Sequence, residues 1–166
     1  MELGMIGLGK MGNFMAQRLI KGGHRVVGFD PAADARKRLE DKGGKTADSL
    51  QALVGMLEAP RALWTMVPAG AITGQTINAL ASLLDSGDVV IDGGNSNYKD
   101  SMRNAQNLAA KKIHFVDCGT SGGVWGLDEG YSMMVGGDAD VVERLRPIFE
   151  ALAPGKDQGW GRVGPC

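Results

Sequence analysis

Short, almost continuously apolar runs alternate along the chain with longer segments whose apolar residues recur at helical spacing. The short runs predict strands at residues 2–6, 25–29, 62–66, 88–91, 113–116 and 131–135. The longer segments predict helices at residues 11–21, 34–42, 49–57, 71–84, 98–111 and 139–152. This alternation is typical of an α/β fold with a doubly wound, mostly parallel sheet and helices on both faces. Within residues 71–84, the spacing predicts one apolar face made by Ile72, Thr76, Ala79, Leu80 and Leu83.

The end of the chain has a different composition. Residues 153–166 contain two prolines and four glycines and show no apolar periodicity, so we predict a linker there and a domain at residues 1–152. Because no helix or strand closes the sequence, we expect it to be the N-terminal part of a longer protein. A naturally disordered tail is the alternative.

The first predicted strand runs directly into a glycine-rich turn that opens the first helix. This turn, Gly7-Leu8-Gly9-Lys10-Met11-Gly12, has the G-x-G-x-x-G pattern of Rossmann-type dinucleotide-binding domains. Gly7 permits the tight turn, Gly9 leaves room for a pyrophosphate, and Gly12 lets the helix pack close to the strand. The free N–H groups at the helix N-terminus then favour a bound phosphate. We therefore predict a Rossmann-type cofactor domain.

An acidic residue, Asp30, ends the second predicted strand. A carboxylate there can accept hydrogen bonds from ribose hydroxyls and would repel a 2′-phosphate, which favours NAD over NADP. Asp30 followed by Pro31 also fits a helix N-cap with proline at the first position, and that is the alternative role. Arg36 and Arg38 in the next helix are candidates for restoring some NADP binding.

Composition limits the classes of binding partner and the cellular compartment to be expected. The net charge of −1 gives no reason to expect a nucleic-acid or membrane partner. Two distant cysteines, Cys118 and Cys166, argue against a disulfide framework and indicate a cytoplasmic protein. The sequence shows no signal peptide, and no cluster with metal-ligand spacing, so no metal is expected. Cys118 is expected to be a small buried residue, and His24 and His114 have no evident acid–base partner.

Two more polar turns follow predicted strands, at the edge where ligands bind in open α/β sheets. In residues 92–96, two glycines present Asn95, whose amide can both donate to and accept from a ligand; a plain Asx turn is the alternative. Ser121, Gly122 and Gly123 can form an anion-binding nest suited to a substrate carboxylate; an ordinary glycine loop is the alternative.

In this order, the motifs resemble those of the decarboxylating 6-phosphogluconate dehydrogenases, in the β-hydroxyacid dehydrogenase superfamily. The segment at residues 92–96, Asp-Gly-Gly-Asn-Ser, is the most specific part of the resemblance. Residues 119–126 resemble the shorter, often NAD-preferring branch, and residues 30–32 differ from the Asn-Arg-Thr common in the NADP branch. The matching segments are residues 7–12, 66–70, 92–98 and 121–126.

The resemblance implies a role for each turn. The glycine turn binds the pyrophosphate, and Asn95 contacts both the nicotinamide ribose and the substrate. The nest holds the sugar-acid end of 6-phosphogluconate. The implied reaction is hydride transfer from C3 to the nicotinamide, loss of CO₂ and protonation to ribulose 5-phosphate, without a metal. The residues implied to line the cofactor after the strand at 62–66 are Val67, Pro68 and Ala69.

The resemblance also implies what this chain lacks. The family's general base, a lysine, and its general acid, a glutamate, lie on a helix beyond the equivalent of Cys166, followed by an all-helical dimerisation domain. We therefore expect weak NAD binding without turnover, an exposed apolar patch where that domain docks, and a homo-oligomeric complete enzyme. The alternatives are the cofactor domain of a 3-hydroxyisobutyrate-type dehydrogenase and a non-catalytic NAD-binding module.

Overall fold

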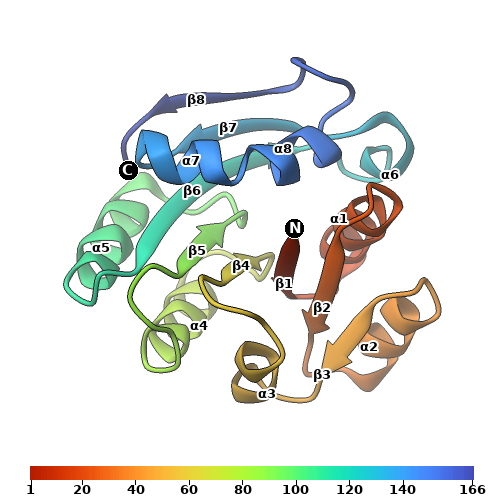
Figure 1. Ribbon diagram of the computed structural model, residues 1–166, viewed down its shortest axis with the longest axis horizontal. Coiled ribbons are helices and arrows are strands. Elements are labelled where there is room, and N and C mark those ends of the chain that lie inside the picture. The colour runs from red at the N-terminus through yellow and green to blue at the C-terminus, as the bar shows by residue number, and fades with distance from the viewer.

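The computed structural model describes residues 1–166 and shows one eight-stranded sheet with helices on both faces (Figure 1). The predicted α/β fold is confirmed. The strands are β1 (Glu2–Ile6), β2 (Arg25–Phe29), β3 (Lys45–Ala47), β4 (Ala62–Thr65), β5 (Val89–Asp92), β6 (His114–Ser121), β7 (Ser132–Gly136) and β8 (Trp160–Gly164). The helices are α1 (Lys10–Lys21), α2 (Ala33–Glu40), α3 (Leu50–Gly55), α4 (Ala71–Ala81), α5 (Tyr98–Ala109), α6 (Gly126–Glu129), α7 (Ala139–Arg144) and α8 (Arg146–Leu152).

The strand order is β3-β2-β1-β4-β5-β6-β7-β8. The first six strands are parallel and follow the Rossmann order, β7 runs antiparallel to β6, and β8 runs parallel to β7. The chain reverses its winding between β1 and β4, which makes their carboxyl ends the switch point of the sheet. The residues aligned at this edge by the strand register are Phe29, Ile6, Thr65 and Asp92.

Two separate hydrophobic cores cover the two faces of the sheet. One core packs α1, α2, α7 and α8 against the sheet, and Trp64 meets Phe149 there edge-to-face at 5.9 Å between ring centroids. The other core packs α3, α4 and α5 against the opposite face. Burial of both faces explains why the central strands are almost continuously apolar.

The segment predicted as a linker at residues 153–166 contributes a strand, and that part of the prediction is wrong. β8 pairs with β7, and the Trp160 ring stacks on Phe149 of α8 with centroids 5.0 Å apart. Gly161, Arg162 and Gly164 hid this strand, because they supply no apolar side chains for a period-two pattern. The sequence also missed β3 and α6, and α7 and α8 replace the single helix predicted at residues 139–152.

The predicted apolar face of α4 is also partly wrong. Leu80 is buried as expected, but the other buried positions are Thr73 and Ile77, and Ile72 is 51% exposed. The Thr73 hydroxyl donates to the Pro68 carbonyl at 2.8 Å, which turns this polar side chain toward the preceding loop. A satisfied hydroxyl can be buried at little cost, so apolar spacing alone misjudged the face of the helix.

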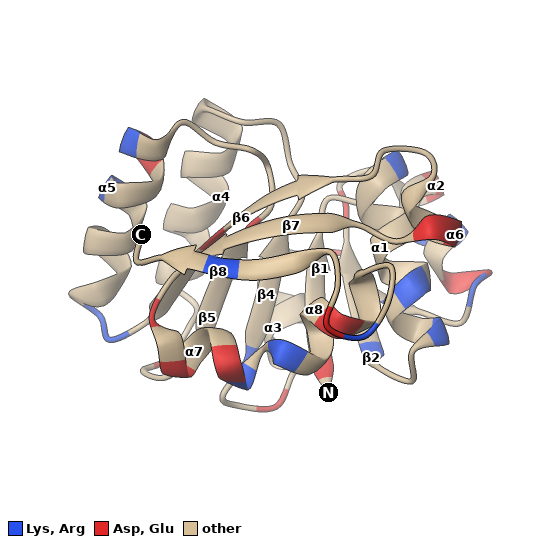
Figure 2. Ribbon diagram, turned by 90° about the horizontal axis from the view of Figure 1, so that it is seen from above, with Lys and Arg blue, Asp and Glu red and all other residues tan.

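Charged residues of both signs are interspersed over the helices and loops around the sheet (Figure 2). None of the helices combines the length and the hydrophobicity needed to cross a membrane.

Candidate functional site

The glycine turn places the start of α1 against the end of β1. Gly7 has a positive φ of 91°, and a Cβ built on it would lie 2.4 Å from the Met66 carbonyl oxygen. A Cβ on Gly12 would lie 2.0 Å from the Gly7 carbonyl oxygen. The structure therefore requires glycine at both positions, for the turn and for close helix packing, as the sequence predicted.

Gly9 differs, because a Cβ built there would have no atom within 4 Å beyond those of its own chain neighbours and the adjoining helix backbone. The first hydrogen bond of α1 runs from the Asn13 N–H to the Gly9 carbonyl at 2.9 Å. The N–H groups of Gly9, Lys10 and Met11 precede it and have no acceptor within the chain. Unpaired amides beside open space at a helix N-terminus suit a phosphate group, so this cradle fits the pyrophosphate of a dinucleotide.

Asp30 is joined to the glycine turn. Its carboxylate accepts hydrogen bonds from the Leu8 N–H at 2.8 Å and from the Ala32 N–H at 2.9 Å. The N-cap of α2 is Ala32, so the alternative in which Asp30 caps the helix with Pro31 at its first position is wrong. A carboxylate has about four acceptor sites, which leaves about two for ribose hydroxyls. The Arg36 Nη1 donates to the Asp30 carbonyl at 2.7 Å, which places a guanidinium at the same turn.

The loop after β4 lies between the glycine turn and the turn after β5. The Val67 side chain approaches Gly7, and the Val67 carbonyl oxygen lies 2.9 Å from a Cβ built on Gly94. Pro68 and Ala69 are exposed at the same edge. This contiguity brings together the glycine turn, the 67–69 loop and the turn that carries Asn95.

A buried carboxylate shapes the turn after β5. Asp92 is 1% exposed, accepts the Gly94 N–H at 3.0 Å and accepts the Ser96 hydroxyl at 2.7 Å. Asn95 between them has a positive φ of 54°, which asparagine tolerates better than most residues. The Asx turn considered as the alternative for this segment is therefore present, and it holds Asn95 at the edge of the sheet.

Asn95 is less free than its predicted position at the tip of a turn implied. Its Nδ2 donates to the Thr120 carbonyl at 3.3 Å, and its Oδ1 accepts the Thr120 N–H at 3.1 Å. These two bonds tie the Asn95 turn to the end of β6. One amide hydrogen and one acceptor lone pair remain for a ligand, and the residue is exposed.

The turn after β6 presents unpaired amides. The N–H groups of Gly122, Gly123 and Val124 donate to no other atom of the chain. The Gly122 carbonyl accepts from the Trp125 and Gly126 N–H groups, both at 3.1 Å, which fixes the turn. The adjoining cavity of about 570 Å³ is lined by residues that include Asn95, Ser121 and Ser132. This geometry suits an anion beside Asn95.

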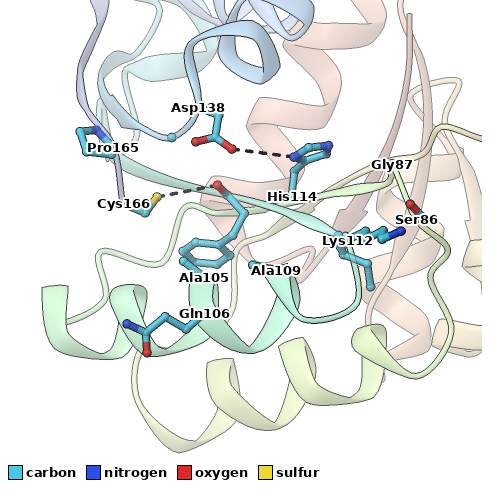
Figure 3. A pocket seen from close by; sticks show the side chains of 13 residues that line it. Ser86, Gly87, Ala105, Gln106, Ala109, Lys112, His114, Asp138, Pro165 and Cys166 are labelled. Carbon is cyan, nitrogen blue, oxygen red and sulfur yellow. Dashed lines mark hydrogen bonds and ion pairs between the residues drawn. The ribbon is translucent and has the colours of Figure 1, made fainter.

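Neither histidine lies at this edge, and the cysteine next to it is fully buried. Cys118 is 0% exposed, and burial raises the pKa of its thiol to about 12, so it stays protonated. His24 hydrogen-bonds the N-terminal ammonium. His114 opens β6 at the amino end of the strand, 4.0 Å from Asp138 in a pocket of about 520 Å³ (Figure 3). No group of three or more metal-ligating side chains is present.

Asp92 shapes the turn that carries Asn95, a role not predicted from the sequence. A signal for it was available, since Asp92 is an acid at a strand end followed by two glycines.

The chain is similar to one enzyme family throughout its length. A family model described as the NAD binding domain of 6-phosphogluconate dehydrogenase matches residues 2–161. The NAD(+)-dependent, decarboxylating 6-phosphogluconate dehydrogenase of Haloferax volcanii is 44% identical over 164 residues, which cover 99% of this chain and 54% of that protein. The decarboxylating enzyme of Bacillus licheniformis is 40% identical over 155 residues, covering 91% of this chain and 33% of that protein.

The fold is also similar to that of a solved structure. The 3-hydroxyisobutyrate dehydrogenase of Mycobacterium tuberculosis superposes with a TM-score of 0.89 and 27% identity, covering 99% of this chain and 55% of that one. The chain therefore spans about half the length of this enzyme and of the Haloferax relative.

Proposed function

The chain belongs to the family of NAD-binding domains of 6-phosphogluconate dehydrogenase, and on that premise we propose that it is the cofactor-binding part of an enzyme that oxidatively decarboxylates 6-phosphogluconate to ribulose 5-phosphate. The observation that carries the proposal is the pair of hydrogen bonds between Asn95 and Thr120. They hold the Asn95 amide beside the open amides after β6, which supports a site where the cofactor and the sugar acid meet.

Each turn has a defined task in this proposal. The α1 amides bind the pyrophosphate, and Asp30 accepts the ribose hydroxyls and disfavours a 2′-phosphate. NAD, when bound, supplies the acceptor for the hydride. Asn95 orients the substrate hydroxyls, and the residues that hold the sugar-acid end are Ser121, Gly122 and Gly123.

We assign proton transfer to residues outside this chain. A general base must lie within hydrogen-bond reach of the hydroxyl it deprotonates, and neither histidine lies at this edge of the sheet. The family resemblance assigns the roles of base and acid to a lysine and a glutamate elsewhere in the complete enzyme. The chain alone is therefore expected to bind NAD and to turn over no substrate.

An apolar patch supports docking of a further domain. Four side chains around one cavity of about 510 Å³ are exposed by 47% or more, namely Tyr98, Met102, Met134 and Val163. We propose that a helical domain of the complete enzyme covers them and makes the homo-oligomer.

The free cysteines further support a cytoplasmic location.

Two assays test the function. The 166-residue chain is titrated with NAD and then incubated with NAD and 6-phosphogluconate while NADH absorbance is followed. NAD binding without NADH formation is expected. Sustained NADH formation at an enzymatic rate would contradict the proposal that proton transfer needs residues outside this chain. In the complete enzyme, Asn95→Ala should lower kcat/KM for 6-phosphogluconate by about 100-fold, whereas Asn78→Ala, on the exposed surface of α4, should leave it unchanged.

The similarity to 3-hydroxyisobutyrate dehydrogenase supports a second candidate substrate. A competition assay of the complete enzyme with both acids separates the two. Preference for 6-phosphogluconate is expected, and preference for 3-hydroxyisobutyrate would replace the proposed substrate while leaving the NAD site unchanged.

A further inference from the structure

The Arg18 side chain of α1 closes the end of α8 with three hydrogen bonds to backbone carbonyls. Its Nε donates to Ala151 at 3.1 Å and to Leu152 at 3.0 Å, and its Nη2 donates to Ala153 at 2.6 Å. The last carbonyls of a helix have no intrahelical partner and carry partial negative charge. A guanidinium is therefore well matched to this end of α8.

The same guanidinium also holds α6. Its Nη1 donates to the Leu127 carbonyl at 3.1 Å and to the Asp128 carbonyl at 3.3 Å. All five acceptors of Arg18 are thus backbone carbonyls, and they belong to two different segments. Only a forked group with several donors can reach both at once, so lysine is no substitute here.

The placement of α6 depends on such contacts. It has four residues, too few to be stable as an isolated helix. It continues directly from the open turn after β6, because the Trp125 and Gly126 N–H groups donate to the Gly122 carbonyl. A shift of α6 would therefore move the open amides of Gly122 and Gly123.

The other end of α1 carries the glycine turn. Gly12 packs on the Gly7 carbonyl, so the position of α1 along its axis is fixed by the dinucleotide-binding turn. Arg18 lies on the same helix, about 13 Å along the axis from Gly9 at 1.5 Å per residue. Figure 1 shows α6 beside α1, and the two helices are in contact.

We propose that Arg18 is a positioning residue that couples the two halves of the site. A dinucleotide bound at the N-terminus of α1 restrains that helix, and Arg18 carries the restraint to α6 and thereby to the amides that hold the sugar acid. The inference rests on the proposed function for the identity of the second ligand, but the coupling between the turns can be measured without that ligand.

The first test follows amide hydrogen exchange of the 166-residue chain with and without saturating NAD. In the unsubstituted chain, NAD is expected to slow exchange across residues 126–129 by about threefold or more. In Arg18→Lys and Arg18→Met the slowing should fall below about 1.5-fold while NAD still binds within about twofold of its original Kd. Arg18→Lys keeps the charge and most of the stem, so it decides the test if Arg18→Met does not fold.

Arg25→Met is the matched control. Arg25 also donates from two guanidinium nitrogens to another segment's backbone, the Met56 carbonyl at 3.2 Å, but it lies at the amino end of β2. The control should retain the NAD-dependent slowing. Equal slowing in Arg18→Lys and the unsubstituted chain, or no slowing in the unsubstituted chain, would overturn the proposal.

The second test titrates 6-phosphogluconate in the presence and absence of NAD. NAD is expected to strengthen its binding to the unsubstituted chain, and the strengthening factor should fall toward one in Arg18→Lys. If NAD strengthens 6-phosphogluconate binding by the same factor in Arg18→Lys as in the unsubstituted chain, the proposed coupling is wrong. If the unsubstituted chain binds no 6-phosphogluconate, the proposed function of the turn fails, and the exchange measurement alone decides whether Arg18 couples the turns.

Discussion

At the scale of single residues, Gly9 and Gly12 have opposite surroundings within one turn of α1. A Cβ on Gly9 meets nothing, whereas a Cβ on Gly12 meets a backbone carbonyl oxygen that cannot move aside freely. The two positions therefore separate a glycine required by the ligand from a glycine required by the fold.

Gly9→Ala and Gly12→Ala should separate these two requirements experimentally. We expect Gly12→Ala to lower the free energy of unfolding by about 1–3 kcal/mol through overpacking. Gly9→Ala should change it by less than about 1 kcal/mol and weaken NAD binding by about tenfold or more. Thermal unfolding and NAD titration measure both. Loss of stability in Gly9→Ala with unchanged NAD affinity would contradict the assignment.

Asp30 and Arg36 should together set the choice of cofactor. Asp30→Ser removes the negative charge that opposes a 2′-phosphate and leaves Arg36 beside the same turn. We expect the ratio of NADP to NAD affinity to rise by about 100-fold, roughly 2.7 kcal/mol, and most of this gain to be lost in the double variant with Arg36→Gln. Isothermal titration with both cofactors gives the ratio. Adding Arg38→Gln instead tests the other candidate arginine, and an unchanged ratio in Asp30→Ser would show that Asp30 does not select the cofactor.

At the scale of elements, β8 and α6 are short segments whose place depends on other parts of the chain. β8 forms one edge of the sheet and covers α8 with the Trp160 ring. α6 is held between α1 and the Tyr131 ring, which lies against Gly122 and Gly126. Both elements lie beside the proposed substrate turn, so the stability of the fold and the geometry of the site depend on the same contacts.

A chain ending at Leu152 should be less stable than the 166-residue chain. The truncation removes β8, exposes the edge of β7 and uncovers Phe149, so the free energy of unfolding should fall by about 3 kcal/mol or more. Ending the chain after Gly164 keeps β8 and serves as the control; it removes the thiol bonds of Cys166 to the Phe115 and Gly136 carbonyls, so a smaller loss of about 1–2 kcal/mol is expected. Urea unfolding compares the three chains. Equal stability of all three would restore the boundary predicted at residue 152.

At the scale of the whole molecule, the core that packs α1, α2, α7 and α8 against the sheet buries two groups that titrate only when the protein unfolds. Cys118 and Tyr131 are both 0% exposed, and burial raises the pKa of each to about 12, from ordinary values of 9.0 and 10.0. The unfolded chain therefore releases these protons at lower pH than the folded chain. The associated stability is fully present below pH 9 and is lost as the pH rises toward 12.

The alkaline limb of the stability curve should become shallower in Tyr131→Phe. Each group ionised only in the unfolded chain contributes a slope of about 1.4 kcal/mol per pH unit, and this variant removes one such group. It keeps the ring against which Gly122 and Gly126 pack, and it removes a buried hydroxyl that has no hydrogen-bond partner. Urea unfolding from about pH 8 to about pH 11 gives the slopes. Parallel curves for the variant and the original chain would contradict the expectation.

Local sequence was enough to predict the parallel sheet, six of its strands and the glycine turn. β1 and β2 have the bounds predicted from their apolar runs, because the residues after the first position of each strand are mostly buried and carry no charge. The roles of Gly7 and Gly12 were predictable because only glycine fits a fixed strand–turn–helix geometry. The acid at position 30 was recognisable from its distance to that turn.

Tertiary structure decided which groups these residues contact. Asn95 bonds to Thr120, Asp30 to Leu8, and Arg18 to carbonyls more than one hundred residues away in the chain. Tertiary structure also placed β8 in the sheet and decided that Thr73 belongs to the buried face of α4. The physical reason is common to these cases. Their partners are mostly backbone N–H and C=O groups, which every residue except proline carries, so nothing in the sequence marks which of them will be reached.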